Sequence, residues 1–156
     1  MRILLAVDGS GFSDSAVREI AGRPWPAETE VKIVSVVELP TTTTEMWALP
    51  ETFYAQQEEA ATKHANAAVD RAVECFKSIR SGSREVPLPL LTEIVVGRAT
   101  EAIMRVSKSW NADLVVLGSH GKHSLERFLL GSVSQDLAYH APCSVEIVRR
   151  VKVRSK

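Results

Sequence analysis

The sequence predicts an α/β fold, a single domain in which short strands alternate with helices around a mostly parallel sheet. The length of 156 residues suits one domain. The chain is 45% hydrophobic and 24% charged, which is ordinary for a globular protein with a buried core. Apolar runs of strand length alternate along the chain with longer stretches of helical periodicity. This alternation implies right-handed crossovers and helices on both faces of the sheet.

Five short runs rich in β-branched or aliphatic residues are predicted to be strands. Two of them are continuously apolar, as expected of parallel strands that are buried on both faces. Pro87 and Pro89 stand at the start of the third run and indicate a strand at the edge of the sheet. The predicted strands are residues 3–7, 31–37, 88–96, 114–117 and 144–148.

Four stretches with apolar residues at helical spacing are predicted to be helices. The first has Ser13 or Asp14 available as its N-cap and is stopped by two prolines. In the longest, alanines and larger apolar residues recur at steps of three and four, which predicts one buried face. The predicted helices cover residues 16–21, 56–81, 99–110 and 131–140.

Two segments have no clear periodicity. Residues 40–53 are predicted to be a long loop, either a lid over a binding site or a solvated connection with Trp47 packed on the body. Residues 151–156 form a basic tail that follows the single domain of residues 1–150, and we expect it to be solvated.

Composition excludes several classes of protein. Nineteen basic and nineteen acidic residues give zero net charge, which argues against general nucleic-acid binding. No apolar run approaches the roughly 20 residues that span a bilayer, and the first residues do not resemble a signal peptide. Cys75 and Cys143 are far apart and form no metal-binding pair, so we expect two ordinary thiols in a cytoplasmic protein.

The segment after the fourth predicted strand carries the clearest chemical signal. Gly118 and Gly121 allow backbone N–H groups to turn toward one centre, an arrangement suited to anions. Gly131 and Ser132 then open a helix, whose N-terminus also favours negative charge. Between them, Lys122, His123 and Arg127 are candidate cations for phosphate oxygens. The alternative is structural, because glycine after a buried strand is common and Ser132 could serve only as an N-cap.

The spacing G-x2-G-x9-G-[ST] resembles the nucleotide-binding signature of the universal stress protein family. Here the pattern is formed by Gly118, Gly121, Gly131 and Ser132. The resemblance extends over nearly the whole chain, through the runs at residues 1–10, 95–99, 112–121, 130–134 and 141–145.

The resemblance implies an ATP-binding member of that family, with a doubly wound sheet of strand order 3-2-1-4-5. ATP or AMP would be the ligand, and Mg²⁺ or Mn²⁺ could accompany it. By position, Asp8 would lie beside the adenosine at the end of the first strand, with Val7 before it, and Val36 would offer backbone groups to adenine. The residues implied to surround ribose and phosphates are Leu117, Gly118, Gly121, Gly131, Ser132 and Val133, with Ser134 nearby.

The chain has few groups suited to rapid catalysis. No P-loop, G-x-S-x-G elbow or acidic pair for two metal ions is present, so we expect nucleotide-dependent regulation with at most slow ATP hydrolysis. His120 and His123 are expected to be solvated, and a triad of Ser10, His120 and Asp8 has little support. His64 and His140 are expected on helix surfaces.

Other functions and the assembly stay open at this point. The run at residues 9–15 is superficially similar to the phosphate loop of adenylating ATP pyrophosphatases, although Phe12 replaces its second glycine. A scaffold that binds no nucleotide is a further alternative. The last strand is expected at the sheet edge, and both its exposure and the resemblance predict a homodimer through it. A protein partner that senses the nucleotide state is also expected.

Overall fold

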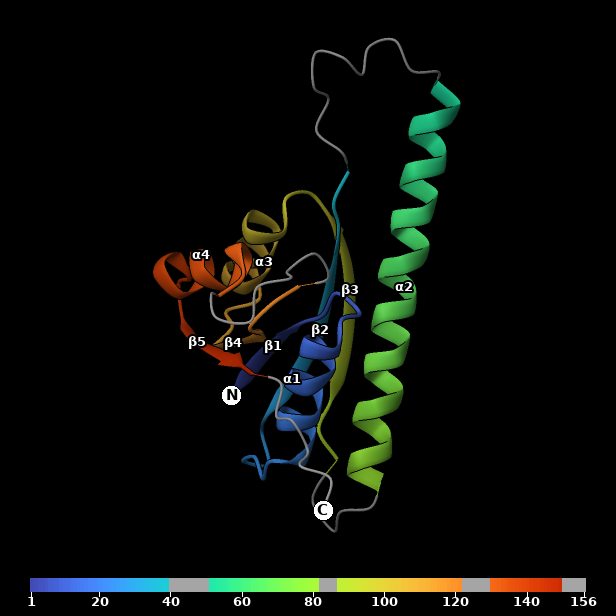
Figure 1. The fold of residues 1–156 in the computed structure, drawn as a ribbon. Helices are drawn as coiled ribbons and strands as arrows, with labels where there is room; N and C mark the ends of the chain where they lie inside the picture. The colour runs from blue at the N-terminus through green and yellow to red at the C-terminus, as the bar shows by residue number, and fades with distance from the viewer. Residues whose placement is uncertain (40–50, 82–86, 122–129, 150–156) are drawn as a thin grey trace, which may run out of the picture.

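The computed structural model describes residues 1–39, 51–81, 87–121 and 130–149. Within them a five-stranded sheet is covered by two helices on each face (Figure 1). In chain order the elements are β1 (Arg2–Ala6), α1 (Gly11–Gly22), β2 (Glu30–Val37), α2 (Glu51–Ser81), β3 (Leu90–Val96), α3 (Ala99–Ser109), β4 (Leu114–Gly118), α4 (Ser132–His140) and β5 (Ser144–Val148).

All strand pairs are parallel, and the strand order is β3-β2-β1-β4-β5. Ile3 of β1 pairs with Val31 of β2 on one side and with Leu114 of β4 on the other. The chain therefore runs outward from β1 through β2 to β3, then returns to place β4 and β5 on the other side. The predicted fold class and strand order are confirmed. The reversal of order lies between β1 and β4, where sheets of this kind leave a crevice at the carboxyl ends of their strands.

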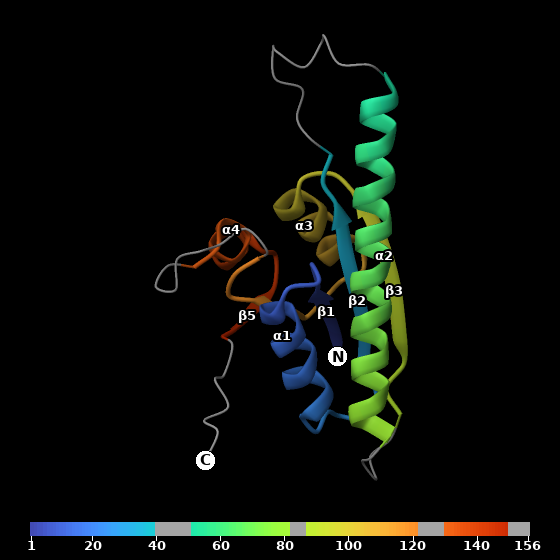
Figure 2. The ribbon, with the colours of Figure 1, turned by 45° about the vertical axis from the view of Figure 1, so that its right-hand side comes forward.

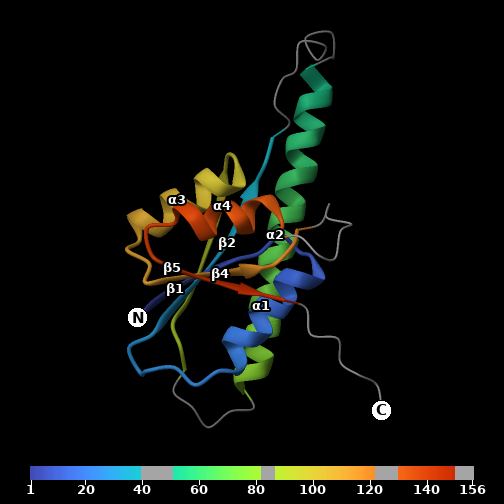
Figure 3. The ribbon, with the colours of Figure 1, turned by 60° about the vertical axis from the view of Figure 1, so that its left-hand side comes forward.

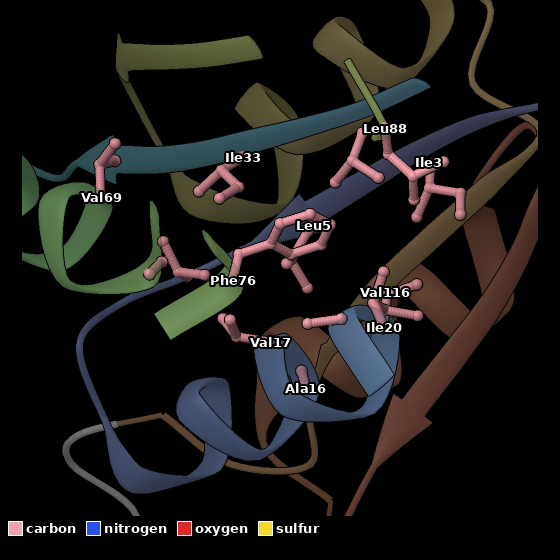
Figure 4. Close-up of a cluster of buried hydrophobic side chains, with 14 of the residues drawn as sticks. Ile3, Leu5, Ala16, Val17, Ile20, Ile33, Val69, Phe76, Leu88 and Val116 are labelled. Carbon is pink, nitrogen blue, oxygen red and sulfur yellow. The ribbon is translucent and has the colours of Figure 1, made fainter. Parts of the chain in front are cut away.

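Alternate residues of β1, together with Val7 directly after it, enter two separate cores. Ile3, Leu5 and Val7 pack with α1 and α2, whereas Leu4 and Ala6 pack with α3 and α4. Figure 3 shows α3 and α4 together on the face of the sheet opposite α1. Figure 4 shows the first core, in which side chains of the sheet meet side chains of α1 and α2. Burying one such aliphatic side chain contributes about 1.5–3 kcal/mol, so both faces of β1 stabilise the fold.

Helix α2 is longer than its packed part. The predicted apolar face is confirmed over its second half, where Ala65, Ala68, Ala72 and Phe76 are buried. Of residues 52–60, all but Tyr54 are exposed, and this end of α2 projects past the sheet (Figures 1 and 2). The expectation of a loop up to residue 53 is wrong at its end, because α2 begins at Glu51. Alanine, glutamine and glutamate dominate the first turns, and these strong helix formers extend the helix without packing. The rest of that predicted loop, residues 40–50, lies outside the described residues.

Two further boundaries differ from the sequence prediction. Ser10, not Ser13 or Asp14, is the N-cap of α1, and its side chain accepts a hydrogen bond from the Ser13 N–H. A turn closed by Asp8 brings Ser10 into this position two residues after the carboxylate. Strand β3 begins at Leu90 and lies at the sheet edge, as the prolines before it predicted. The predicted basic tail lies outside the described residues.

The described chain has no helix long and apolar enough to cross a membrane. Both cysteines are free and half-buried. Burial raises the pKa of the Cys143 thiol, and the charge of Asp113 raises it further. Cys143 is therefore a protonated, packed side chain at neutral pH, as expected of an ordinary thiol.

Candidate functional site

A cavity of about 890 Å³ lies at the carboxyl ends of β1, β2 and β4, where the strand order reverses. Helices α2, α3 and α4 complete its walls. All ten residues predicted from the sequence line it: Val7, Asp8, Val36, Leu117, Gly118, Gly121, Gly131, Ser132, Val133 and Ser134. The structure thus gathers these residues in one place, while their contact with a nucleotide stays a prediction.

The turn after β1 presents Asp8 to the cavity. Its Oδ1 accepts a hydrogen bond of 2.9 Å from the Ser10 N–H, which fixes the carboxyl group over the start of α1. Gly9 between them has a φ of +78°, in the left-handed region that favours glycine. A Cβ atom on Gly121 would lie 3.1 Å from Asp8 Oδ2, so the carboxylate and the glycine loop after β4 are in close approach.

The loop after β4 is tied both to the sheet and to α4. The Ser119 N–H donates to Val148 O, and the Gly131 N–H donates to Ser119 O, each at 2.9 Å. The buried Ser134 hydroxyl donates to Gly118 O at 2.9 Å. This hydroxyl therefore links α4 to β4. Of the two donor groups of Ser134, the backbone N–H is the one that faces the N-terminal end of α4.

The N-terminus of α4 differs from those of α1 and α3. Ser10 accepts from the first turn of α1, and Glu38 Oε1 accepts from the Ala99 N–H at 2.6 Å at the start of α3. The N-cap of α4 is Gly131, and no described side chain accepts a hydrogen bond there. The alternative in which Ser132 is only an N-cap is therefore wrong, because Ser132 is already the first helical residue.

Backbone groups of β2 extend past the end of β1. The Val7 N–H donates to Val34 O at 2.9 Å, so the backbone of Val34 faces β1. The backbone groups of successive residues in a parallel strand point to opposite neighbouring strands. The N–H and C=O of Val36, two residues after Val34, therefore point to the β1 side of β2. The β1–β2 ladder ends at the pair Ala6 and Val34, so Val36 faces the space beyond it. Ile103 of α3 adds an apolar wall to the cavity.

Two histidines of the cavity wall were not predicted as site residues. His64 of α2 lies at the helix surface, as expected, but it also lines the cavity with Nε2 2.9 Å from Asp8 O. His120 is half-buried and not solvated: Nδ1 lies 3.0 Å from Ser119 Oγ and the ring packs against Phe12. The contact with the Phe12 ring, whose centroid lies 5.0 Å from that of His120, removes part of the imidazole from solvent, which explains the difference. The predicted cations Lys122, His123 and Arg127 lie outside the described residues.

The arrangement does not form the triad considered above. Ser10 Oγ accepts from the Ser13 N–H, and His120 faces Ser119 instead of Ser10. Within the described ranges, no group of three or more His, Cys, Asp or Glu side chains could hold a metal ion on its own. The same ranges place no lysine or arginine on the cavity wall.

The chemistry of the cavity suits a ligand with an anionic end and an apolar, hydrogen-bonding end. Its volume lies within the roughly 300–1,000 Å³ that is typical of small-molecule sites. An uncapped helix N-terminus can bind phosphate oxygens, because its N–H groups donate hydrogen bonds to them. Strand-end backbone groups next to an aliphatic wall can bind the edge of a base. The residues present therefore fit a nucleotide.

Comparison with known proteins assigns the family. The model of the universal stress protein family matches residues 1–149. The chain belongs to the universal stress protein family. A putative universal stress protein of Staphylococcus aureus (strain USA300) is 30% identical over 150 residues, which cover 94% of this chain and 82% of that protein.

Solved universal stress protein structures share the fold. UspA from Lactobacillus plantarum has a TM-score of 0.75 and 26% identity, and the match covers 96% of this chain and 97% of that one. A universal stress protein in complex with cAMP has a TM-score of 0.61 at 22% identity, covering 95% of each chain. A family member from Arabidopsis thaliana with AMP bound has a TM-score of 0.60 at 16% identity, covering 97% of this chain and 92% of that one.

Proposed function

We propose that this universal stress protein binds an adenine nucleotide, ATP above all, in the cavity and acts as a nucleotide-dependent regulatory protein of the stress response. The observation that carries the proposal is the N-terminus of α4, which opens on the cavity with a glycine as its N-cap. Three N–H groups there, those of Ser132, Val133 and Ser134, precede the first intrahelical bond, which the Gln135 N–H makes to Gly131 O.

The contacts also give the nucleotide an orientation. The phosphates would lie at α4, because the N-termini of α1 and α3 are already filled by Ser10 and Glu38. The base would lie at the other end of the cavity, against the backbone of Val36 and the side chain of Ile103. The ribose would lie between them, near Asp8. The structures of family members with AMP or cAMP bound support an adenine nucleotide.

The same contacts favour tight holding over rapid chemistry. One oxygen of Asp8 already accepts from the Ser10 N–H, and the remaining groups at α4 are hydrogen-bond donors. We propose that Mg²⁺ or Mn²⁺, where it takes part, is carried by the phosphate oxygens. We expect turnover below about one per second, the lower end for ordinary enzymes. The pyrophosphatase alternative is disfavoured, because the loop at Ser10 uses its own hydroxyl to cap α1.

Isothermal titration with ATP, AMP, cAMP and GTP, with and without Mg²⁺, tests the proposal. We expect ATP to give a measurable binding heat that saturates as the ligand is added. We expect GTP to bind at least tenfold more weakly, because the Val36 backbone would pair with the edge of adenine. Mass spectrometry of small molecules released from freshly purified protein gives an independent readout. Absence of binding by every nucleotide at millimolar concentration would leave the scaffold alternative in place.

We also propose a cytoplasmic homodimer formed through β5. The backbone of Val148 faces β4, because its carbonyl accepts from the Ser119 N–H. By the same alternation, the backbone groups of Val145 and Ile147 point away from the sheet, where a second copy could pair with them.

Sedimentation at micromolar protein is expected to give the mass of a dimer. Ile147→Pro removes one outward N–H and leaves the β4–β5 ladder intact, so it is expected to give a folded monomer. Circular dichroism checks the fold. A wild-type protein that sediments as a monomer contradicts the dimer.

A further inference from the structure

Helix α2 contacts two consecutive carbonyl groups of the turn that presents Asp8. His64 Nε2 lies 2.9 Å from Asp8 O, and Arg71 Nη2 donates to Gly9 O. His64 and Arg71 are seven positions apart, which places them two turns apart on one face of the helix. Two donors of one rigid element therefore hold two adjacent peptide groups of the turn.

Gly9 makes this close approach feasible. A Cβ atom there would lie 3.2 Å from His64 Nε2 and 3.4 Å from Arg71 Nη2, and the φ of +78° disfavours any other residue. The turn and the helix are thus fitted to each other at this position. The sequence shows only a glycine after an aspartate, which is also typical of a turn with no such contact.

The same turn is held from within. Asp8 Oδ1 accepts from the Ser10 N–H, and Arg71 also lies 3.2 Å from Asp14 Oδ1 in the first turn of α1. The carbonyl groups of residues 8 and 9 therefore face α2, while the Asp8 carboxylate faces the cavity beside Gly121. The Gly9 carbonyl that Arg71 holds belongs to the same peptide group as the Ser10 N–H, so rotation of that group would break the hydrogen bond that fixes the Asp8 carboxylate.

We infer that His64 and Arg71 are positioning residues of the ligand site, which fix Asp8 through the backbone of its turn. Arg71 is not part of the cavity wall, so it would act on a ligand without touching it, through the turn that it holds. The effect on ligand affinity rests on the proposed nucleotide binding. The effect on the turn itself does not, and it can be measured without ligand.

Arg71→Met tests the inference, with Arg71→Lys as the conservative variant. Lys77→Met is the matched control, because it removes one positive charge from an exposed position on the same helix. In ligand-free protein, Arg71→Met is expected to speed hydrogen exchange at the Ser10 and Ser13 amides severalfold, while Lys77→Met leaves them unchanged. For ATP, Arg71→Met is expected to weaken affinity about fivefold to tenfold, and Arg71→Lys to restore most of it. Combined with Asp8→Ala, Arg71→Met is expected to add little, because both act through one group.

The outcomes separate the two proposals. Unchanged exchange at Ser10 and Ser13 in Arg71→Met overturns the positioning role. The positioning role is also overturned if Lys77→Met lowers ATP affinity as much as Arg71→Met does. It is likewise overturned if Arg71→Met lowers affinity by its full amount in a protein that already carries Asp8→Ala. If exchange at Ser10 and Ser13 is faster in Arg71→Met but the wild-type protein binds no nucleotide, the contact of α2 with the turn is supported and the proposed function is overturned instead.

Discussion

Replacing Gly131 with aspartate is expected to abolish ATP binding while leaving the protein as stable as before, or slightly more stable. Gly131 has φ −61° and ψ 152°, which any residue adopts, and its Cβ position is 3.4 Å from the nearest atoms. An aspartate at this N-cap would accept from the first N–H groups of α4 and add a negative charge there. The cap would stabilise the helix by up to about 1 kcal/mol. A phosphate group would then find the N–H groups already hydrogen-bonded and would be repelled by the carboxylate. We expect an affinity loss of about 100-fold or more by isothermal titration, with an unchanged or raised melting temperature.

Two further substitutions at Gly131 separate the causes. Gly131→Ala adds the Cβ atom without a cap and is expected to keep affinity within about fivefold. Gly131→Asn caps the helix without a charge and is expected to fall between alanine and aspartate. Wild-type affinity in a stabilised Gly131→Asp protein would show that the phosphates lie elsewhere.

Replacing Gly118 with alanine is expected to destabilise the fold by about 3 kcal/mol or more. Its Cβ atom would lie 2.6 Å from the carbonyl carbon of Phe12 and 2.8 Å from the carbonyl oxygen. These are backbone atoms of α1, so relief requires a shift of the helix against β4, and overpacking that forces such shifts costs about 1–3 kcal/mol and in some cases more. Urea unfolding followed by circular dichroism measures the change.

Gly22→Ala is the matched control for Gly118→Ala. Gly22 ends the same helix α1, and apart from its chain neighbours and its own helix backbone no atom lies within 4 Å of its Cβ position. The identical change there is expected to leave the free energy of unfolding unchanged or to raise it by up to about 1 kcal/mol. Equal effects at the two glycines would mean that the approach of α1 to β4 is looser than the structure indicates.

The order of elements was predictable because each strand and helix carries its own local pattern. The continuous apolar runs at β1 and β4 indicated strands buried on both faces, and the three-and-four spacing in α2 indicated its packed face. Boundaries were less predictable. The N-cap of α1 depends on the turn closed by Asp8, and the start of α2 depends on helix propensity without packing.

The candidate site was predictable where its groups are close in sequence or share a family motif. The structure brings Gly118, Gly121 and Gly131 to one cavity, as their spacing indicated. The residues that sequence missed act across long separations. His64 reaches Asp8 from a helix 56 residues away, and Glu38 fills the N-terminus of α3 from the end of β2. Histidine and glutamate are residue types that are common on protein surfaces, so no local sequence pattern distinguishes these two from ordinary surface residues.

The projecting end of α2 divides that helix into two parts with different thermal behaviour. At 1.5 Å per residue the 31 residues extend about 46 Å, and the buried contacts begin only near Ala65. The outer turns therefore open with a local free energy well below that of global unfolding. Heating should remove part of the helical circular dichroism before the main transition, and limited proteolysis should nick these turns first. The inner turns, which include His64 and Arg71, should melt only with the sheet.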